Sequence, residues 1–258
     1  MLSLDLEPST IATSAESLAS QVNVAQSQSA ETAAVNSAVP DFRSYTNVQQ
    51  KKADFFNYML PMIQASNARI LAQRARLHHA LSLVQRGQPL TIDDEQFINR
   101  TFRQYRVAVP AQIHAPQLQA LLARVDVVPA SLVLAQSANE SGWGTSRFAR
   151  QANNFFGIWC FTEGCGLTPL RRDAGLSHEV ARYDSVADGV AAYMMTINTH
   201  AAYESLRDIR SMQRNGVGAV CGEELAEGLV MYSERGMDYV REIQKMILAN
   251  NLAEFNNA

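Results

Sequence analysis

The stretch that decides the fold reads Val128-Pro129-Ala130-Ser131-Leu132-Val133-Leu134-Ala135-Gln136-Ser137-Ala138-Asn139-Glu140, followed by Ser141-Gly142-Trp143-Gly144. Most of its residues are apolar or small, and Pro129 suits the first turn of a helix, where a backbone N–H has no helical partner. The two glycines then favour a sharp turn after the last helical residue. We therefore expect a buried helix over residues 128–140, with Glu140 at its C-terminal end.

The region before this helix is also helical in pattern. Over residues 51–86 the apolar side chains recur at spacings typical of one helix face, namely Phe55, Met59, Ile63, Ile70, Leu77, Leu81 and Val84. Pro61 lies inside the pattern and predicts a break or kink near residue 60. Thr91 is expected to cap a second helix that reaches about residue 105, and a short helix should follow over residues 116–125.

The region after the helix begins irregularly. Residues 151–183 are rich in Gly, Asn and aromatic residues, with one possible hairpin that pairs residues 168–172 with residues 179–183. Helical patterns then return over residues 185–200, 203–213, 222–230 and 236–250. The chain is thus predicted to be mainly α, and its irregular aromatic middle is where functional residues are expected.

Composition limits the class of protein. The chain has 258 residues, of which 47% are hydrophobic and 18% charged, as in an ordinary globular protein. Residues 1–40 are rich in Ser, Ala, Gln and Thr and contain no aromatic residue, so we expect them to be disordered. Residues 1–41 hold five acids and no Lys or Arg, so the remainder carries +2 of the net −3. Such a nearly neutral body lacks the dense basic patch of a nucleic-acid-binding protein.

The sequence shows no membrane or export segment. No window approaches 18 apolar residues, so no transmembrane segment is predicted. The N-terminus has neither a basic n-region nor an apolar h-region, so no secretory signal is visible. A cytosolic protein, a mature exported protein and a chain with a misplaced start all fit this observation.

Two of the three cysteines lie close together in Cys160-Phe161-Thr162-Glu163-Gly164-Cys165. A disulfide that closes this loop would stabilise the fold by about 2 kcal/mol, and two reduced thiols also fit the spacing. Zinc would need two more ligands, and none of the five histidines has ligand spacing near the pair. We therefore expect no metal and no other cofactor. Cys221 is expected to be a small buried hydrophobe.

Glu140 is the strongest candidate for catalysis. Gln136 precedes it by four residues, so both side chains should project from one helix face. A carboxyl group among apolar neighbours has a desolvated charged form, which raises its pKa toward the range of a general acid. The segment Asn153-Asn154-Phe155-Phe156-Gly157-Ile158-Trp159 follows, and it combines rings that stack on sugars with amides that bind hydroxyl and acetamido groups. This combination favours a glycan-binding groove.

These motifs resemble a known family. Glu140-Ser141-Gly142-Trp143-Gly144-Thr145-Ser146, with Asn154-Phe155-Phe156-Gly157-Ile158 after it, is similar to the peptidoglycan-cleaving endo-β-N-acetylglucosaminidases of glycoside hydrolase family 73. The nearest likeness is to the Bax-type periplasmic members. It covers about residues 125–250 and includes Tyr183-Asp184-Ser185, the stretch 198–203, and the segment from Tyr232 to Tyr239. The helical region upstream looks like the N-terminal extension of the Bax-type members.

The resemblance implies a lysozyme-like, two-lobed α domain with a cleft and a small β-hairpin over residues 126–258. A helical extension over residues 41–125 would pack on it. The implied reaction is hydrolysis of the β-1,4 bond after N-acetylglucosamine in peptidoglycan glycan strands, with Glu140 as general acid and Tyr239 beside the −1 sugar. The residues predicted to contact the glycan are Gln136, Trp143, Asn154, Phe156, Gly157, Trp159, Tyr183, Tyr203 and Tyr232.

The second catalytic group is where the chain departs from the family. Many members carry another glutamate in a Thr-Glu-Tyr-like hairpin, whereas this chain reads Thr168-Pro169-Leu170-Arg171-Arg172. Glu163, Asp173 and Glu179 lie near that stretch in the sequence, and Glu179 is the candidate retained. In one mechanism the acetamido oxygen of the substrate attacks its own anomeric carbon. In the other, a mobile loop that carries Glu179 activates water.

Other functions fit parts of the sequence. A lytic transglycosylase would use a similar Glu-Ser motif but leave an anhydro-sugar at N-acetylmuramic acid, and a non-catalytic murein-binding module would explain the missing second acid. A cysteine peptidase would need Cys221 activated by His200. We favour the glucosaminidase, expected to be a monomer. It should be periplasmic or otherwise exported, because murein lies outside the cytoplasmic membrane and a Cys160–Cys165 bridge would persist only in an oxidising compartment.

Overall fold

The computed structural model describes residues 39–170, 172, 175, 177–216 and 218–257. Most of the segment predicted to be disordered, residues 1–38, lies outside this range. The described α-helices and strands, in chain order, are α2 (Val48–Gln85), α3 (Ile92–Gln104), α4 (Ala115–Arg124), α5 (Ala130–Ser141), α6 (Arg147–Ala152), β1 (Trp159–Cys160), β2 (Gly166–Leu167), β3 (Glu179–Ala181), α7 (Val186–Thr199), α8 (Glu204–Gly216), α9 (Gly222–Leu225) and α10 (Met237–Ala249). Short 3-10 helices follow α7, α9 and α10 at Ala201–Tyr203, Ala226–Leu229 and Leu252–Asn257. The predicted mainly α architecture with a small β element is confirmed.

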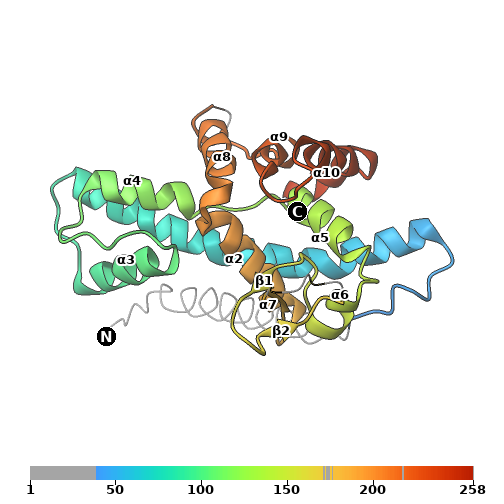
Figure 1. Ribbon diagram of the computed structural model, residues 1–258. Helices are drawn as coiled ribbons and strands as arrows, with labels where there is room; N and C mark the ends of the chain where they lie inside the picture. The colour runs from blue at the N-terminus through green and yellow to red at the C-terminus, as the bar shows by residue number, and fades with distance from the viewer. Residues whose placement is uncertain (1–38, 171, 173–174, 176, 217, 258) are drawn as a thin grey trace, which may run out of the picture. The chain divides into compact units, whose positions relative to one another are not determined.

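Helix α5 lies at the centre of the packing. Its residues from Ala130 to Ala138 are all buried, and it contacts α2, α9, α10 and the last 3-10 helix (Figure 1). Pro129 caps its start, and Gly142 ends it in the left-handed conformation at φ +57°, which glycine adopts without strain. The predicted buried helix is therefore confirmed, and its last turn is held at a defined place among its neighbours.

Helix α2 begins three residues earlier than predicted and has no interruption. It runs unbroken from Val48 to Gln85, so a break near residue 60 is wrong, whereas a kink at Pro61 stays a prediction. Pro61 lies on the exposed face, where the carbonyl that loses its helical partner is accessible to water. The opposite face carries the predicted apolar residues, all of which are buried except Val84. Through this face α2 packs against α4, α5 and α7 (Figure 1).

The connection between α4 and α5 contains a buried ion cluster. Asp126 is 2% exposed, and its carboxylate accepts hydrogen bonds from Arg214 at 2.8 and 3.0 Å. Arg74 of α2 lies 3.5 Å from the same carboxylate. Arg210, which is 1% exposed, donates to the backbone carbonyls of Asp126 and Val127. These contacts join α2 and α8 to the segment that leads into α5.

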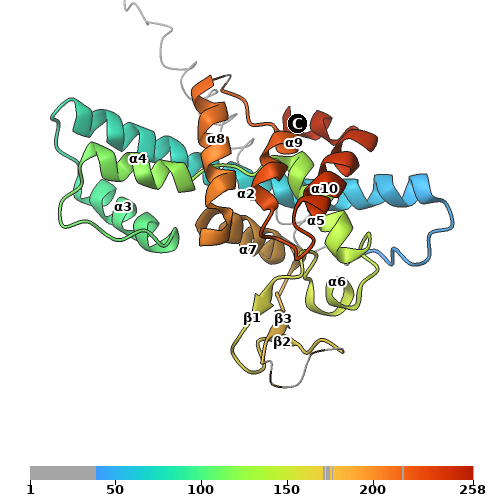
Figure 2. The ribbon, with the colours of Figure 1, turned by 45° about the horizontal axis from the view of Figure 1, so that its top comes forward.

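The β-structure is a three-stranded antiparallel sheet with strand order β1-β3-β2. Trp159 pairs with Val180 on one side of β3, and Leu167 pairs with the same residue on the other side. The predicted hairpin was thus misplaced, because β2 begins at Gly166 rather than at residue 168, and residue 171 lies outside the described range. Figure 2 shows this sheet extending away from the helices, beyond α6 and α7.

Most of the remaining helices agree with the prediction. The predicted cap at Thr91 forms, because its side chain accepts from the backbone N–H of Asp94, and Ser185 caps α7 in the same way. Helix α6 and the last 3-10 helix were not predicted. None of the described helices is long and apolar enough to cross a membrane. The proposed domain boundary at residues 125 and 126 stays a prediction.

Candidate active site

Glu140 is the penultimate residue of α5, and its carboxyl group is partly buried. The hydroxyl of Tyr239, from α10, donates to Glu140 Oε1 at 2.8 Å. The other oxygen, Oε2, lies under the backbone of Gly157, where a Cβ atom would be 3.8 Å away. Burial raises the pKa of Glu140, and the hydrogen bond from Tyr239 opposes this effect only in part. The surroundings of Glu140 therefore favour its protonated form more than water does.

A cavity of about 430 Å³ opens at Glu140. Five of the residues predicted to contact a glycan line it, namely Phe156, Gly157, Trp159, Tyr203 and Tyr232. Gly157 has φ +66°, so a residue with a side chain would be strained at this turn. The cavity walls therefore combine acidic groups with aromatic and backbone surfaces, as in sites that bind carbohydrate.

Tyrosines hold the wall opposite Glu140 in place. The rings of Tyr232 and Tyr239 stack at 5.4 Å with an interplanar angle of 6°. The Tyr232 hydroxyl donates to the backbone carbonyl of Phe156 at 2.8 Å. The Phe156 ring stacks in turn on Tyr193 at 4.1 Å. These contacts tie the Phe-Gly-Ile turn to α7 and to the segment before α10, so the turn and Glu140 keep a fixed separation.

Asn154 shapes the turn from inside. It is 1% exposed, and its side-chain amide donates to the carbonyls of Ile158 and Ala181, both at 2.9 Å. Its side-chain oxygen, Oδ1, accepts hydrogen bonds from the backbone N–H groups of Phe156 and Ile158, both at 3.2 Å. All of these hydrogen bonds are internal. The predicted contact of Asn154 with the glycan is therefore replaced by a structural role in the turn.

Three other predicted contact residues lie outside the cavity lining. Gln136 is fully buried, and its amide is used by two tyrosines behind the cavity. The ring of Trp143 packs edge-on against Phe55 and Phe56 of α2, so it joins α5 to that helix. Tyr183 packs against Gly189 at the start of α7. For these residues the sequence identified the neighbourhood of the site but not the direction of the side chains.

Trp159 forms an exposed platform at the edge of the cavity. Its side chain is 56% exposed, which is unusual for tryptophan, and its ring stacks on His178 at 4.1 Å with an interplanar angle of 17°. The strand pairing with Val180 fixes its backbone. An exposed ring held flat in this way suits stacking on the apolar face of a sugar.

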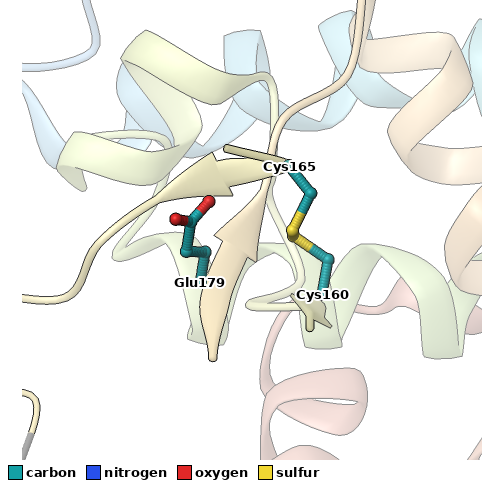
Figure 3. Close-up of side chains that lie close together, drawn as sticks. All are labelled: Cys160, Cys165 and Glu179. Carbon is teal, nitrogen blue, oxygen red and sulfur yellow. A yellow bond between two sulfur atoms is a disulfide. The ribbon is translucent and has the colours of Figure 1, made fainter. Parts of the chain in front are cut away.

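Glu179 lies in the small sheet, beside the disulfide that joins Cys160 and Cys165 (Figure 3). Its Oε2 accepts from the backbone N–H of Gly166 at 2.7 Å, and its Oε1 from that of Gly164 at 3.2 Å. These contacts close the loop between β1 and β2. The disulfide also removes both thiols from any metal site that could be built with Glu179. The catalytic role suggested for Glu179 stays a prediction, and the observed contacts give it a structural one.

Sequence reasoning missed five residues of the cavity lining, namely Tyr193, Thr196, Met231, Ser233 and Glu234. Glu234 is exposed and follows Tyr232 by two residues, so it brings a second carboxyl group into the wall that contains Tyr232. The sequence did offer one signal for Glu234, because it lies between Tyr232 and Tyr239 in the C-terminal stretch that resembles the family. Tyr193 gave no signal, because it reads as an ordinary apolar position of a buried helix.

Cys221 was predicted to be buried, but it is exposed, because it caps the short helix α9 at the surface. His200, its proposed partner in a peptidase, accepts at Nδ1 from the backbone N–H of Ala202. The structure therefore gives no support to a cysteine nucleophile.

Comparisons with known proteins agree with this site. Residues 115–252 match the model of the glucosaminidase family, described as mannosyl-glycoprotein endo-beta-N-acetylglucosaminidase. The chain is also 32% identical over 206 residues to protein Bax of Escherichia coli (strain K12), an alignment that covers 80% of this chain and 72% of Bax. No solved structure gives a significant match. The family match includes Glu140, the Phe-Gly-Ile turn and Tyr239.

Proposed function

Because the chain belongs to the glucosaminidase family of glycoside hydrolases, we propose that it cleaves the β-1,4 bond after N-acetylglucosamine in the glycan strands of peptidoglycan. The observation that carries this proposal is the Glu140 carboxyl group, which lies under Gly157 in an aromatic-lined cavity. The family supports the broader class, a peptidoglycan hydrolase. The particular bond and the role of each residue are our proposal.

Glu140 is the general acid in this mechanism. Its raised pKa keeps a proton available, and the C-terminal end of a helix also disfavours a negative charge. As the bond between the anomeric carbon and the glycosidic oxygen breaks, the proton moves from Glu140 to that oxygen. The resulting carboxylate is stabilised by the Tyr239 hydroxyl, which already donates to Oε1. Glu140 then recovers a proton from the water that completes hydrolysis.

The substrate itself supplies the nucleophile in the route we favour. The acetamido oxygen of N-acetylglucosamine attacks the anomeric carbon as the leaving oxygen departs, and water later opens the cyclic intermediate. This route fits a site in which Glu179 is engaged by two backbone N–H groups of the small sheet. Glu234 offers the competing route, because an exposed carboxylate on the cavity wall can activate water directly.

Analysis of cleavage products by mass spectrometry tests the reaction. Purified peptidoglycan is digested with the wild type and with Glu140→Gln, and the new chain ends are identified. We expect reducing N-acetylglucosamine ends from the wild type and a loss of turnover of at least about 100-fold in the variant. Anhydro-N-acetylmuramic acid ends would show a lytic transglycosylase instead. Full activity of the folded Glu140→Gln protein would contradict the assignment of the general acid.

The variant Glu234→Gln separates the two routes for the nucleophile. The substrate-assisted mechanism predicts that kcat falls by less than about tenfold, because Glu234 then contributes only to binding. A water-activating role predicts a loss of about 100-fold or more, with rescue by an added small anion such as azide. Initial rates on soluble glycan fragments, together with the anomeric configuration of the first product, measure both outcomes.

The remaining proposals follow from the substrate. Because the family acts on peptidoglycan, we propose that the protein works in the periplasm or outside the cell, as a monomer and without nucleic acid. We also propose that residues 126–258 form the catalytic domain and residues 41–125 an extension that supports it. Helix α2 of the extension packs directly on α5 and α7, which contribute Glu140 and Tyr193.

A further inference from the structure

A chain of hydrogen bonds lies behind the cavity and ends at Glu140. The Tyr193 hydroxyl donates to Gln136 Oε1, Gln136 Nε2 donates to the Tyr239 hydroxyl at 2.9 Å, and that hydroxyl donates to Glu140 Oε1 at 2.8 Å. Gln136, Tyr193 and Tyr239 are 0%, 1% and 2% exposed. The chain thus joins α7, α5 and α10 through buried side chains, of which Tyr193 also lines the cavity.

The hydrogen bonds in this chain have a fixed direction. An amide nitrogen can only donate, so the Tyr239 oxygen must accept from Gln136. The tyrosine hydroxyl has a single hydrogen, which is then free to point at Glu140. The amide cannot turn over without cost, because its carbonyl oxygen is already paired with Tyr193. If it did turn over, Gln136 would present an oxygen to Tyr239 and draw the hydroxyl hydrogen away from Glu140.

We infer that Gln136, oriented by Tyr193, is a positioning residue that keeps the transferable proton on Glu140 Oε2. Oε1 is committed as an acceptor from Tyr239, so a proton on the carboxyl group occupies the other oxygen. Oε2 is also the oxygen under Gly157, on the turn that lines the cavity. The inference rests on the proposed function, because it specifies which oxygen protonates the leaving group.

Other groups near Glu140 also act on its pKa. Glu242 raises the pKa of Glu140 and Arg235 lowers it through their charges, and the side chain of Asn139 lowers it as well. Tyr203 and Tyr232 face Glu140 from the cavity wall. The variants Tyr193→Phe and Gln136→Met leave all of these groups in place, so any change they cause comes from the chain.

The test uses both variants and the pH dependence of kcat. Without the oriented amide, Tyr239 no longer donates reliably to the carboxylate, so the ionised form loses a hydrogen bond and the pKa of Glu140 rises. The alkaline limb of kcat should therefore move up by about 0.5–1 pH unit. The protonated carboxyl group can then donate through Oε1 to Tyr239, so kcat should fall by about tenfold while KM changes little. The double variant should shift the limb no further than Gln136→Met alone.

Tyr105→Phe is the matched control, because it also removes a buried tyrosine hydroxyl that donates to a glutamine oxygen, here Gln73 Oε1 at 2.9 Å. It should leave the alkaline limb of the kcat profile and kcat itself unchanged.

A carbon-13 NMR titration of the Glu140 carboxyl group, assigned with Glu140→Gln, reports the same shift without substrate. Thermal unfolding shows which variants fold. If Gln136→Met does not fold, the result for Tyr193→Phe alone decides the inference. The inference is overturned if the wild type is active and folded Tyr193→Phe shows neither a moved alkaline limb of kcat nor a shifted Glu140 titration. An inactive wild type would instead overturn the proposed function.

Discussion

Two carboxylates removed from bulk water, Asp126 fully and Glu140 in part, lie near opposite ends of α5, and they behave in opposite ways. Asp126 precedes the helix, and Glu140 is in its last turn. Burial by itself raises the pKa of both groups. At Asp126 the hydrogen bonds from Arg214 and the charges of Arg210 and Arg74 outweigh burial, so its pKa is lowered. At Glu140 the main opposing partner is the neutral hydroxyl of Tyr239, and its pKa stays raised.

The difference shows how one helix serves both stability and chemistry. The lowered pKa of Asp126 favours its charged form, and this charge pairs with Arg74 of α2 and Arg214 of α8. Glu140 has a neighbour that orients it without supplying a full positive charge, so its pKa stays above the ordinary value for a glutamate. The type of partner, rather than the degree of burial, decides which carboxylate is structural and which is suited to catalysis.

The largest expected effect comes from Asp126→Asn. The substitution leaves the guanidinium groups of Arg74 and Arg214 without the carboxylate that they share and removes the negative charge near Arg210, so we expect the free energy of unfolding to fall by about 3–5 kcal/mol. Activity per folded molecule should be unchanged. Urea unfolding followed by circular dichroism measures the stability. Asp41→Asn is the control, because it removes an exposed carboxylate from its ion pair with Arg43 and should change stability little. A loss below about 1 kcal/mol for Asp126→Asn would contradict the comparison.

The pH dependence of stability gives a smaller effect of opposite sign at the two sites. Asp126, with a lowered pKa, contributes stability that is present above its unfolded value of 3.8 and is lost as pH falls through the folded pKa. Glu140, with a raised pKa, contributes stability that is present below its unfolded value of 4.5 and is lost as pH rises through the folded pKa. We therefore expect Glu140→Gln to gain stability relative to the wild type as pH rises from 4 to 8. Unfolding free energies across this range measure the difference, and parallel curves for the two proteins would show that the pKa of Glu140 is not raised by folding.

The fold was largely predictable because long helices have strong periodic signals. The apolar stripe of α2 and the buried run before Glu140 both proved correct. Pro61 misled the prediction because sequence alone cannot show that its ring lies on the exposed face of a long, well-packed helix. The strands failed for a different reason: β1 and β2 have two residues each, which is too short for any alternation to be read.

The site was predictable in its centre and less so in its surroundings. Glu140, Gly157 and the tyrosines come together as expected, because the motifs specify both residue types and turn geometry. Gln136 was correctly placed on the face of Glu140, but the pattern could not show that Tyr193 and Tyr239 bury it. Glu234 was missed because its one signal, a position between Tyr232 and Tyr239, does not by itself distinguish an acid that lines a cavity from one on the open surface.

Glu179 gives the smallest expected effect and extends the comparison to a third carboxylate, one held by backbone N–H groups rather than by arginine or tyrosine. Glu179→Gln loses the charged acceptor for Gly164 and Gly166, so stability should fall by about 0.5–1.5 kcal/mol. If the residue only orders the small sheet, KM for glycan strands should rise by a few fold, because the Trp159 platform loosens, while kcat stays within about twofold of the wild type. A fall in kcat of about 100-fold without a matching change in KM would instead show that Glu179 activates water. The double variant Cys160→Ser/Cys165→Ser is the matched control, because it loosens the same loop and leaves the carboxylate in place. A change in KM shared by both variants would therefore belong to the sheet, and a change in kcat found only in Glu179→Gln would belong to the chemistry.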